Sequence, residues 1–183
     1  MKIDESFNEA YILDKEGYPY IIHSLMDGVP RVDPGLLAEW AQWASEQSVL
    51  RNATLLVAPE AMALPLATAL SLETGIPFVV VRKRKYDLPG EQIAYCETGY
   101  SQSCLYINDV RPTDRVVVVD DVVSTGGTLE SLLGTLREMN IPIEGVLVPF
   151  EKGEGAERLR KQTQTPILAM RRIDVQGSDI QLS

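Results

Sequence analysis

Two neighbouring carboxylates and a glycine-containing turn follow a strongly apolar run in the second half of the chain. Asp120 and Asp121 come directly after four consecutive valines, and a polar turn at residues 124–128 follows them. A β-branched run of this kind is typical of a strand buried on both faces, while leucines at helical spacing from Leu129 onward predict a helix after the turn. Backbone N–H groups at a helix N-terminus can surround a phosphate. Since carboxylates accept hydrogen bonds from hydroxyl groups, the segment predicts a binding site for a sugar phosphate.

Two other interpretations of this segment stay open from the residues alone. An Asp-Asp pair after a strand also fits a Mg²⁺ site of the Walker-B type, although the chain contains no Gly-x-x-x-x-Gly-Lys-[Ser/Thr] loop to accompany one. Alternatively, Thr-Gly-Gly-Thr is an ordinary strand-to-helix turn in which a threonine side chain caps the helix.

Residues 116–128 resemble the phosphoribosyl-pyrophosphate (PRPP) motif of type I phosphoribosyltransferases. In that motif an apolar strand, an Asp-Asp pair and a Ser-Thr-Gly-Gly-Thr loop follow one another in this order. The resemblance implies that Asp120 and Asp121 bind the ribose hydroxyls of PRPP. It assigns the 5′-phosphate to five residues of the loop, Ser124, Thr125, Gly126, Gly127 and Thr128.

The elements around the motif predict an α/β fold, in which helices flank a central parallel sheet. Asp33 and Pro34 mark the start of a helix as N-cap and first residue, and its Trp40 and Trp43 are expected in the core. Strands alternating with helices indicate right-handed crossovers, so ligand-binding residues gather at the carboxyl ends of the strands. We expect strands at 54–58, 78–81, 105–107, 116–119, 144–150 and 166–170, and further helices at 64–74, 129–139 and from 155.

Residues 1–32 do not share this alternation. Within a single domain, we expect them to form a small hood with one or two short strands, beside an α/β core at 33–175 and a frayed tail at 176–183. His23, the only histidine of the chain, lies in the hood beside an apolar run. It invites a functional role, but a single histidine in such a place is more often structural.

Four basic residues at 82–85 follow the predicted strand at 78–81, at the sheet edge where ligands bind. A charge run is otherwise typical of a solvated face. The stretch up to Ser103 shows no apolar periodicity, which predicts a long mobile loop. Such a loop can close over a substrate and exclude water.

Further segments resemble purine phosphoribosyltransferases. Glu60, Ala61 and Met62 stand where adenine phosphoribosyltransferases carry a Glu-Ala-Arg-Gly loop for pyrophosphate, but Met62 replaces the arginine, so backbone N–H groups would have to hold this anion. The basic run followed by Leu-Pro-Gly resembles the entry into the catalytic loop of the adenine enzymes. Over roughly residues 18–150 the chain looks most like archaeal hypoxanthine/guanine phosphoribosyltransferases, which are built on the adenine-enzyme plan.

Two departures from the related families concern proton transfer. Bacterial and eukaryotic hypoxanthine-guanine enzymes carry an aspartate at the position of Ser124, and adenine enzymes carry a glutamate directly before the tyrosine of their loop, where this chain has Gly99. The identity of a general base therefore stays open, and Glu97 is the candidate that the sequence offers.

The composition excludes several other classes of protein. The chain has 183 residues and a net charge of −9, with a pI of about 4.7, which disfavours nucleic-acid binding through the overall field. Cys96 and Cys104 are too few for a disulfide scaffold or a zinc site. No apolar signal region opens the chain and no run reaches membrane-spanning length. We therefore expect a cytoplasmic globular protein without a membrane partner.

The sequence favours a purine salvage enzyme that joins hypoxanthine, and also guanine, to PRPP with release of pyrophosphate. Arg82, Lys83 and Mg²⁺ would neutralise the departing pyrophosphate, with the ion held mainly by oxygens of PRPP. Hood residues from His23 to Arg31 would read the base. The resemblance also implies a homodimer. Two alternatives are an adenine phosphoribosyltransferase and a regulator that binds PRPP without catalysis.

Overall fold

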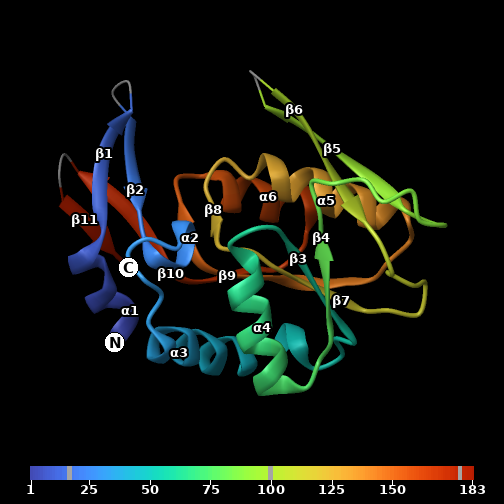
Figure 1. Cartoon of the computed structure of the whole chain (residues 1–183), viewed down its shortest axis with the longest axis horizontal. Helices are drawn as coiled ribbons and strands as arrows, with labels where there is room; N and C mark the ends of the chain where they lie inside the picture. Colours follow the sequence, from blue (N-terminus) through green and yellow to red (C-terminus); the bar gives the residue numbers. More distant parts are fainter. Residues whose placement is uncertain (16–17, 99–100, 177–178) are drawn as a thin grey trace.

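The computed structural model describes residues 1–15, 18–98, 101–176 and 179–183. Its main sheet has the strand order β11-β10-β9-β7-β3-β4, and β8 pairs with β9 (Figure 1). All pairs within it are parallel except that of β10 with β11, which confirms the predicted α/β fold. Its strands are β3 (Leu55–Pro59), β4 (Phe78–Val81), β7 (Val116–Val119), β8 (Val122–Val123), β9 (Ile143–Lys152), β10 (Ile167–Gln176) and β11 (Asp179–Leu182).

Helices cover both faces of this sheet. α3 (Pro34–Ser45) and α4 (Ala63–Thr74) lie on one face, and α5 (Gly127–Glu138) and α6 (Gly155–Thr163) lie on the other (Figure 1). Successive residues of a strand point to opposite faces. Val117 and Val119 of β7 therefore join the core beneath α3 and α4, while Val116 and Val118 join the core beneath α5 and α6. This explains why the central strand is apolar at every position.

None of the helices in the described ranges is both long and apolar enough to span a membrane.

The helix predicted from Asp33 is α3, and its capping is confirmed. The Oδ1 atom of Asp33 accepts a hydrogen bond from the N–H of Leu36 at 3.0 Å. Trp40 is fully buried and donates its Nε1–H to the carbonyl of Leu66 in α4 at 3.3 Å. Trp43 is partly buried against the same core, with its ring centroid 5.4 Å from that of Trp40. Both tryptophans therefore pack in the core, as predicted. A short 3-10 helix, η2 (Ser48–Leu50), follows α3.

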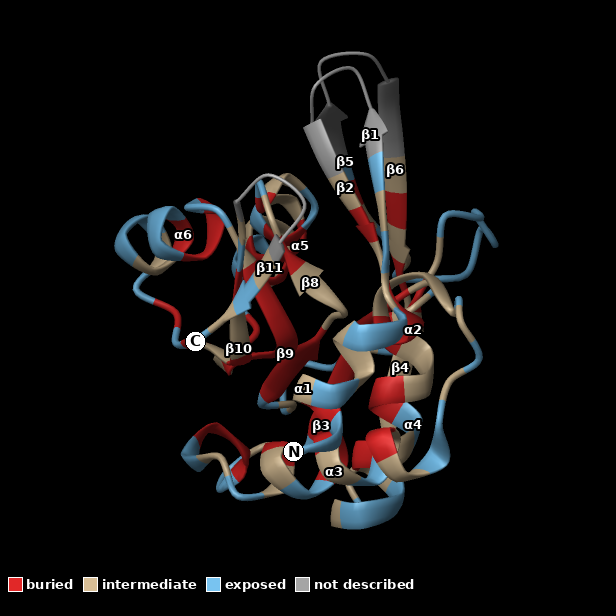
Figure 2. Ribbon diagram, turned by 90° about the vertical axis from the view of Figure 1, so that its left-hand side faces the viewer, coloured by how far each residue is buried: buried red, intermediate tan, exposed pale blue. Residues whose placement is uncertain are grey.

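The hood, residues 1–32, contains two short strands, as predicted. β1 (Tyr11–Lys15) and β2 (Tyr18–Ile22) form an antiparallel hairpin separate from the main sheet. α1 (Lys2–Glu5) and η1 (Ser6–Glu9) precede the hairpin, and α2 (Ser24–Asp27) follows it. The hairpin rises from the same edge of the molecule as the ends of β3, β4 and β8 (Figures 1 and 2).

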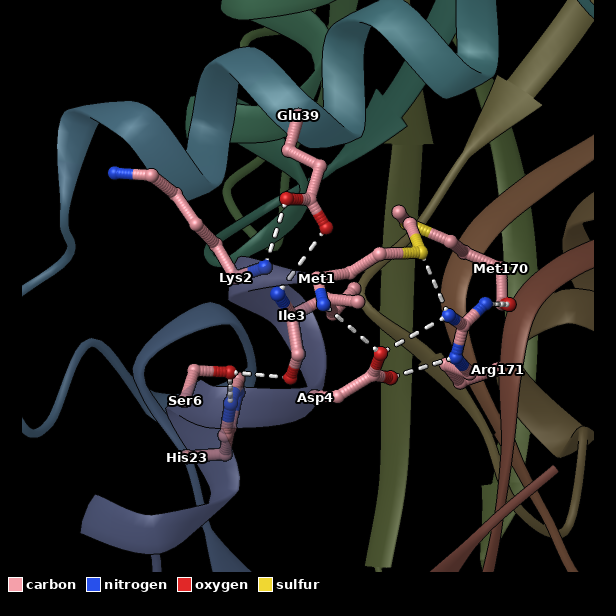
Figure 3. Close-up of polar contacts among 9 residues, drawn as sticks. All are labelled: Met1, Lys2, Ile3, Asp4, Ser6, His23, Glu39, Met170 and Arg171. Carbon is pink, nitrogen blue, oxygen red and sulfur yellow. Dashed lines mark hydrogen bonds and ion pairs between the residues drawn. The ribbon is translucent and has the colours of Figure 1, made fainter.

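The first residues of the hood are tied to the core by polar contacts (Figure 3). The carboxylate of Glu39 in α3 accepts hydrogen bonds from the N–H groups of Lys2 at 2.8 Å and Ile3 at 3.2 Å. Asp4 forms an ion pair with Arg171 of β10, with Oδ1 and Nε 2.7 Å apart. These contacts join α1 both to a helix and to a strand of the core, so the start of the hood has a fixed position.

The prediction of a loop without regular structure up to Ser103 is wrong. β5 (Gln92–Thr98) and β6 (Ser101–Ile107) form an antiparallel hairpin on the other side of the site from the hood (Figure 1). Ala94, Leu105 and Ile107, at the base of the hairpin, are buried in the core beneath α5. Tyr95, the next residue after Ala94, is 69% exposed. Since burial is confined to the base of the hairpin, the strands show no alternation of apolar and polar residues in the sequence. The mobility of this segment stays a prediction.

The prediction of a frayed tail from Gln176 is also wrong. β10 continues to Gln176, and β11 pairs with it in antiparallel register, with Ile173 opposite Leu182 and Val175 opposite Ile180. Ile173 is buried, and the other three side chains pack partly buried against the same core. Apolar residues at alternate positions on both strands therefore hold this end of the chain on the sheet.

Candidate active site

A cavity of about 290 Å³ lies where β7 ends and α5 begins. It brings together segments that are far apart in the sequence, namely the end of β3, the residue Lys83 after β4, the acidic pair after β7 and the start of α5. Parallel strands end at one edge of the sheet, which is why these segments meet. The residues that line the cavity include Pro59, Glu60, Lys83, Leu105, Asp120, Asp121, Ser124, Thr125, Gly126, Gly127 and Thr128.

Residues 124–128, which we call the phosphate loop, have the conformation that an anion site requires. Gly126 is the N-cap of α5 and has a φ of 81°, in the left-handed region that favours glycine. No side chain of the described residues caps this helix, so the interpretation as an ordinary turn with a threonine cap is wrong. Because the first N–H groups of a helix lack partners within the helix, they can receive an anion in the cavity.

The acidic pair lines the cavity beside the phosphate loop. Asp120 Oδ1 accepts a hydrogen bond from the N–H of Asp121 at 3.0 Å. Desolvation, and after it the charge of Asp121, raises the pKa of Asp120 well above its usual range. Desolvation also raises the pKa of Asp121. Two carboxyl groups that resist ionisation at one place are typical of a functional site rather than of a structural ion pair.

Glu60 joins the end of β3 to the basic run after β4. Its Oε2 atom lies 2.9 Å from Nε of Arg82, and its Oε1 atom accepts a hydrogen bond from the N–H of Lys83 at 2.6 Å. Arg82 also pairs through its backbone with Tyr106 of β6. Glu60 therefore fixes the start of the basic run, leaving the exposed Lys83 side chain on the cavity wall.

Ala61 and Met62 do not line this cavity, although Glu60 does. Ala61 is exposed and Met62 is half-buried directly before α4. The thioether of Met62 points to the hood instead, since its Sδ and Cε atoms lie 3.7 Å from the position that a Cβ would take at Gly28. The side chain that replaces the arginine of the adenine enzymes thus packs toward the hood.

A second cavity of about 320 Å³ adjoins the first and shares Asp121, Val122, Ser124 and Thr125 with it. The hood contributes Tyr20, Ile21, Met26 and Asp27 to its other walls, the end of β9 contributes Lys152, and β10 contributes Ile173. The hydroxyl of Tyr20 donates to Oδ1 of Asp27 at 3.0 Å. This hydrogen bond, together with desolvation, raises the pKa of Tyr20, so the phenol stays protonated at neutral pH. Two acidic side chains, Asp27 and Asp121, and one basic side chain, Lys152, line the cavity.

The residues predicted from the sequence did not include Tyr20 and Lys152, and they included Asp27 only as part of the range from His23 to Arg31. Lys152 is the last residue of β9, so the rule that ligands bind at the carboxyl ends of parallel strands would have found it. Tyr20 and Asp27 belong to the hood, where no such rule applies and where only the contact between β2 and α2 brings them together.

The hood range from His23 to Arg31, which was expected to read the base, contributes Met26 and Asp27 to the second cavity, whereas His23 and Arg31 themselves line neither cavity. His23 belongs to the hood and is fully buried. Its Nδ1 accepts from the N–H of Leu25 at 3.2 Å, and its Nε2 lies 2.8 Å from Oγ of Ser6 (Figure 3). Its ring stacks on Phe7, with centroids 4.4 Å apart. Arg31 lines a separate cavity, between α1 and the start of α3. His23 is thus a helix cap and a core residue.

The buried imidazole of His23 predicts a pH dependence of stability. Burial lowers its pKa from 6.5 to about 4. The unfolded chain therefore takes up a proton below about pH 6.5, which the folded protein accepts only near pH 4. We expect this group's contribution to the free energy of unfolding to be complete above pH 6.5 and to fall by about 3 kcal/mol as the pH drops through that window.

Chemical unfolding of the parent and a His23→Asn variant between pH 7 and pH 4 measures this contribution. Asparagine keeps an oxygen that can cap α2 but does not titrate, so the stability of the variant should fall less steeply with pH. Parallel profiles for the two proteins would contradict the expectation.

Glu97 belongs to β5, but its side chain lies outside the part of the chain that the structure describes. Its role as a general base stays a prediction.

Comparison with known proteins gives the family. Residues 35–167 match the model of the phosphoribosyl transferase domain. A protein named hypoxanthine/guanine phosphoribosyltransferase from Methanothermobacter thermautotrophicus is 45% identical over 177 residues, which cover 95% of this chain and 90% of the relative. A relative with the same name from Methanocaldococcus jannaschii is 41% identical over 175 residues, 96% of each chain. The "HGPRTase-like protein 2" of Haloquadratum walsbyi is 47% identical over 151 residues, 82% of this chain and 83% of the relative.

Solved structures agree on the fold. An adenine phosphoribosyltransferase from Thermoanaerobacter pseudethanolicus has a TM-score of 0.74 at 21% identity, covering 93% of this chain and 99% of that one. The enzyme from Giardia lamblia, complexed with 9-deazaadenine, has a TM-score of 0.75 at 18% identity, covering 96% and 99%. Since a family model spans most of the chain and named relatives span nearly all of it, the protein belongs to the phosphoribosyltransferase family.

Proposed function

We propose that the protein transfers the phosphoribosyl group of PRPP to hypoxanthine, and also to guanine, forming the nucleoside 5′-monophosphate and pyrophosphate. The observation that carries this proposal is the pair of adjoining cavities. One joins a helix N-terminus to two carboxylates, which suits the 5′-phosphate and ribose of PRPP. The other is apolar with a few polar groups, as is typical of sites for flat heterocycles. Their shared wall would place a base next to C1′ of the ribose.

The polar groups of the second cavity favour a 6-oxopurine over adenine. Hypoxanthine and guanine present an acceptor at O6 and a donor at N1, whereas adenine presents a donor and an acceptor there. The ammonium of Lys152 is a donor only, and the carboxylate of Asp27 is an acceptor only. Asp27 already accepts from Tyr20 and from the N–H of His23 at 3.0 Å, and further lone pairs remain for N1–H. A site whose polar groups match one base discriminates strongly against another base that would fail to pair with them.

The chemistry needs stabilisation of charge more than a reactive side chain. As the bond from C1′ to pyrophosphate lengthens, positive charge grows on the ribose and negative charge on the leaving group. The carboxylates of Asp120 and Asp121 would hold the ribose hydroxyls next to the first charge. Lys83 on the cavity wall, with Arg82 beside it, would neutralise the second. The backbone of residues 60–62 would complete the pyrophosphate site, and Glu97 is proposed as the general base.

The residues of the first cavity fit Mg²⁺ as cofactor. Mg²⁺ usually binds through one or two carboxylates together with substrate phosphates and water, and Asp120 and Asp121 supply two carboxylates beside the proposed ribose site. When bound, the ion would neutralise charge on the pyrophosphate group.

We further propose that the protein is a homodimer in the cytoplasm, without nucleic-acid or membrane partners. Sedimentation of the purified protein tests the dimer.

A panel of bases tests the proposed function. The protein with PRPP and Mg²⁺ is incubated with equal concentrations of hypoxanthine, guanine and adenine, and the nucleotides and pyrophosphate are quantified. We expect IMP and GMP to exceed AMP by at least tenfold in competition. A Lys152→Met variant should lose much of this preference, because the ammonium can donate a hydrogen bond to O6 of a 6-oxopurine but not to the amino group of adenine. Predominant AMP would indicate an adenine enzyme, and PRPP binding without pyrophosphate release would indicate a regulator.

A further inference from the structure

The phosphate loop is held from behind by the start of α6. Gly155, the first residue of α6, donates its N–H to the carbonyl of Ser124 at 3.1 Å. Arg158, one turn later, donates from Nη2 to the carbonyl of Thr125 at 3.0 Å. Neither residue lines the cavity that contains Asp120. Two successive carbonyls of the loop are thus bonded on the side away from that cavity.

This arrangement decides where the N–H groups of the loop point. The C=O and N–H of a trans peptide point in opposite directions. With the carbonyls of Ser124 and Thr125 bonded to α6, the N–H groups of Thr125 and Gly126 face the other way, toward the cavity that both residues line. No backbone carbonyl within the described ranges accepts a hydrogen bond from either N–H. Contact with the start of α6 therefore leaves two adjacent N–H groups of the phosphate loop, those of Thr125 and Gly126, free to donate to an anion in the cavity.

The contact between loop and helix leaves no space for a side chain at Gly155. A Cβ added there would overlap the carbonyl oxygen of Ser124 and would lie 2.6 Å from the carbonyl carbon of Thr125 and 2.7 Å from its oxygen. All of these atoms belong to the backbone of the phosphate loop, so the loop itself would have to move.

Arg158 is fixed by both helices that flank the loop. Its Nη1 atom lies 2.9 Å from Oε2 of Glu130 in the first turn of α5 and 2.7 Å from Oε1 of Gln162 in α6. The guanidinium is planar and its donors have a fixed geometry. Bonding to Glu130 and Gln162 therefore also orients the group that donates to Thr125.

We propose that α6 sets the conformation of the phosphate loop, with Gly155 and Arg158 as positioning residues for the binding of PRPP. Neither residue touches the substrate; both act through the orientation of the peptides after Ser124 and Thr125. The inference rests on the proposed function only in naming PRPP as the source of the phosphate.

Arg158→Gln tests the role of the guanidinium by steady-state kinetics. We expect the KM for PRPP to rise about tenfold, the size of one lost charge-assisted hydrogen bond, while kcat and the KM for hypoxanthine change by less than about twofold. Arg158→Lys keeps a cationic donor and should recover part of the loss. The control is Arg137→Gln, because Arg137 donates to the carbonyl of Thr163 at 2.6 Å, at the far end of α6 from the loop. An unchanged KM for PRPP in Arg158→Gln, or an equal rise in Arg137→Gln, would overturn the inference.

Gly155→Ala tests the contact with the loop. We expect the KM for PRPP to rise roughly ten- to hundredfold, as for an overpacked site. Gly134→Ala in α5 is the control, since a Cβ there meets nothing within 4 Å. If Gly155→Ala fails to fold, the Arg158 variants still decide the question.

Binding of PRPP separates this inference from the proposed function. Titration calorimetry with PRPP and Mg²⁺ needs no base and no turnover. If the parent turns over no purine, the proposed function fails, but a Kd about tenfold weaker for Arg158→Gln than for the parent would still support the role of α6. If the parent turns over hypoxanthine and the two Kd values are equal, only the inference about α6 fails.

Discussion

Replacing Asp120 and Asp121 together by asparagine is expected to lower kcat/KM for PRPP by at least two orders of magnitude. Both carboxylates line the cavity beside the phosphate loop, where they would accept hydrogen bonds from the ribose hydroxyls. A hydrogen bond to a charged group contributes about 1.5–3 kcal/mol, and each 1.4 kcal/mol is about tenfold in rate. Loss of two such acceptors therefore predicts a decrease of roughly a hundred- to ten-thousandfold, measured by steady-state kinetics.

The same variant is expected to melt at an equal or higher temperature than the parent at neutral pH. A carboxyl group whose pKa is raised by folding favours the folded state only while it is protonated, so its contribution is lost as the pH rises through the raised pKa. This applies to Asp120 and Asp121, whose pKa values are both raised, first of all by desolvation. Asparagine carries no charge at any pH, so the advantage of the variant should shrink as the pH is lowered.

Asp109→Asn is the control for this double substitution. Asp109 is exposed and pairs with Arg111 at 3.2 Å, outside both cavities of the site. Its kinetics and melting temperature should match those of the parent, since exposed ion pairs contribute little. Near-normal turnover by a folded Asp120→Asn, Asp121→Asn protein would exclude the acidic pair from ribose binding.

A second large effect is expected from one methyl group at Gly127. This residue is the first of α5 and lines the cavity, and a Cβ added to it meets no described atom within 4 Å other than its chain neighbours and the backbone of its own helix. Gly127→Ala should therefore fold normally. Its methyl group would occupy space beside the N–H groups that receive the phosphate, so we expect the KM for PRPP to rise roughly ten- to hundredfold.

Gly134→Ala provides the matched comparison, because Gly134 lies in the same helix with equally open space around it but outside the cavity. There, alanine should raise the stability by about 0.5–1 kcal/mol through its helix propensity and leave the kinetics unchanged. Equal KM values for PRPP in the two alanine variants would show that Gly127 does not face the phosphate.

The part of the site that belongs to the core could be predicted from the sequence. The valines before Asp120 mark a strand buried on both faces, and the end of such a strand lies at the edge of the sheet that binds ligands. Glu60 directly follows β3, and Lys83 lies two residues after β4, which are the next two strands of the sheet beyond β7. Local sequence suffices here, because the position of each residue depends on one strand and the rule for parallel sheets.

The second cavity could not be predicted in this way. Tyr20 and Asp27 face Lys152 across more than one hundred residues of sequence, and only the docking of the hood on β9 brings them together. The chemistry of a single histidine suggests a functional role for His23, yet Phe7 and Phe150 contact its ring in the core. The β5–β6 hairpin leaves no apolar alternation in the sequence because, among its described residues, only Ala94, Leu105 and Ile107 at its base belong to the core.

The wall common to the two cavities links the affinities of two ligands. Asp121, Val122, Ser124 and Thr125 belong to both, so any shift that one ligand imposes on these residues changes the free energy with which the other binds. Thermodynamics requires that coupling to be reciprocal. PRPP and the base are therefore expected to bind with coupled affinities. The factor by which PRPP alters the affinity for a base equals the factor by which that base alters the affinity for PRPP.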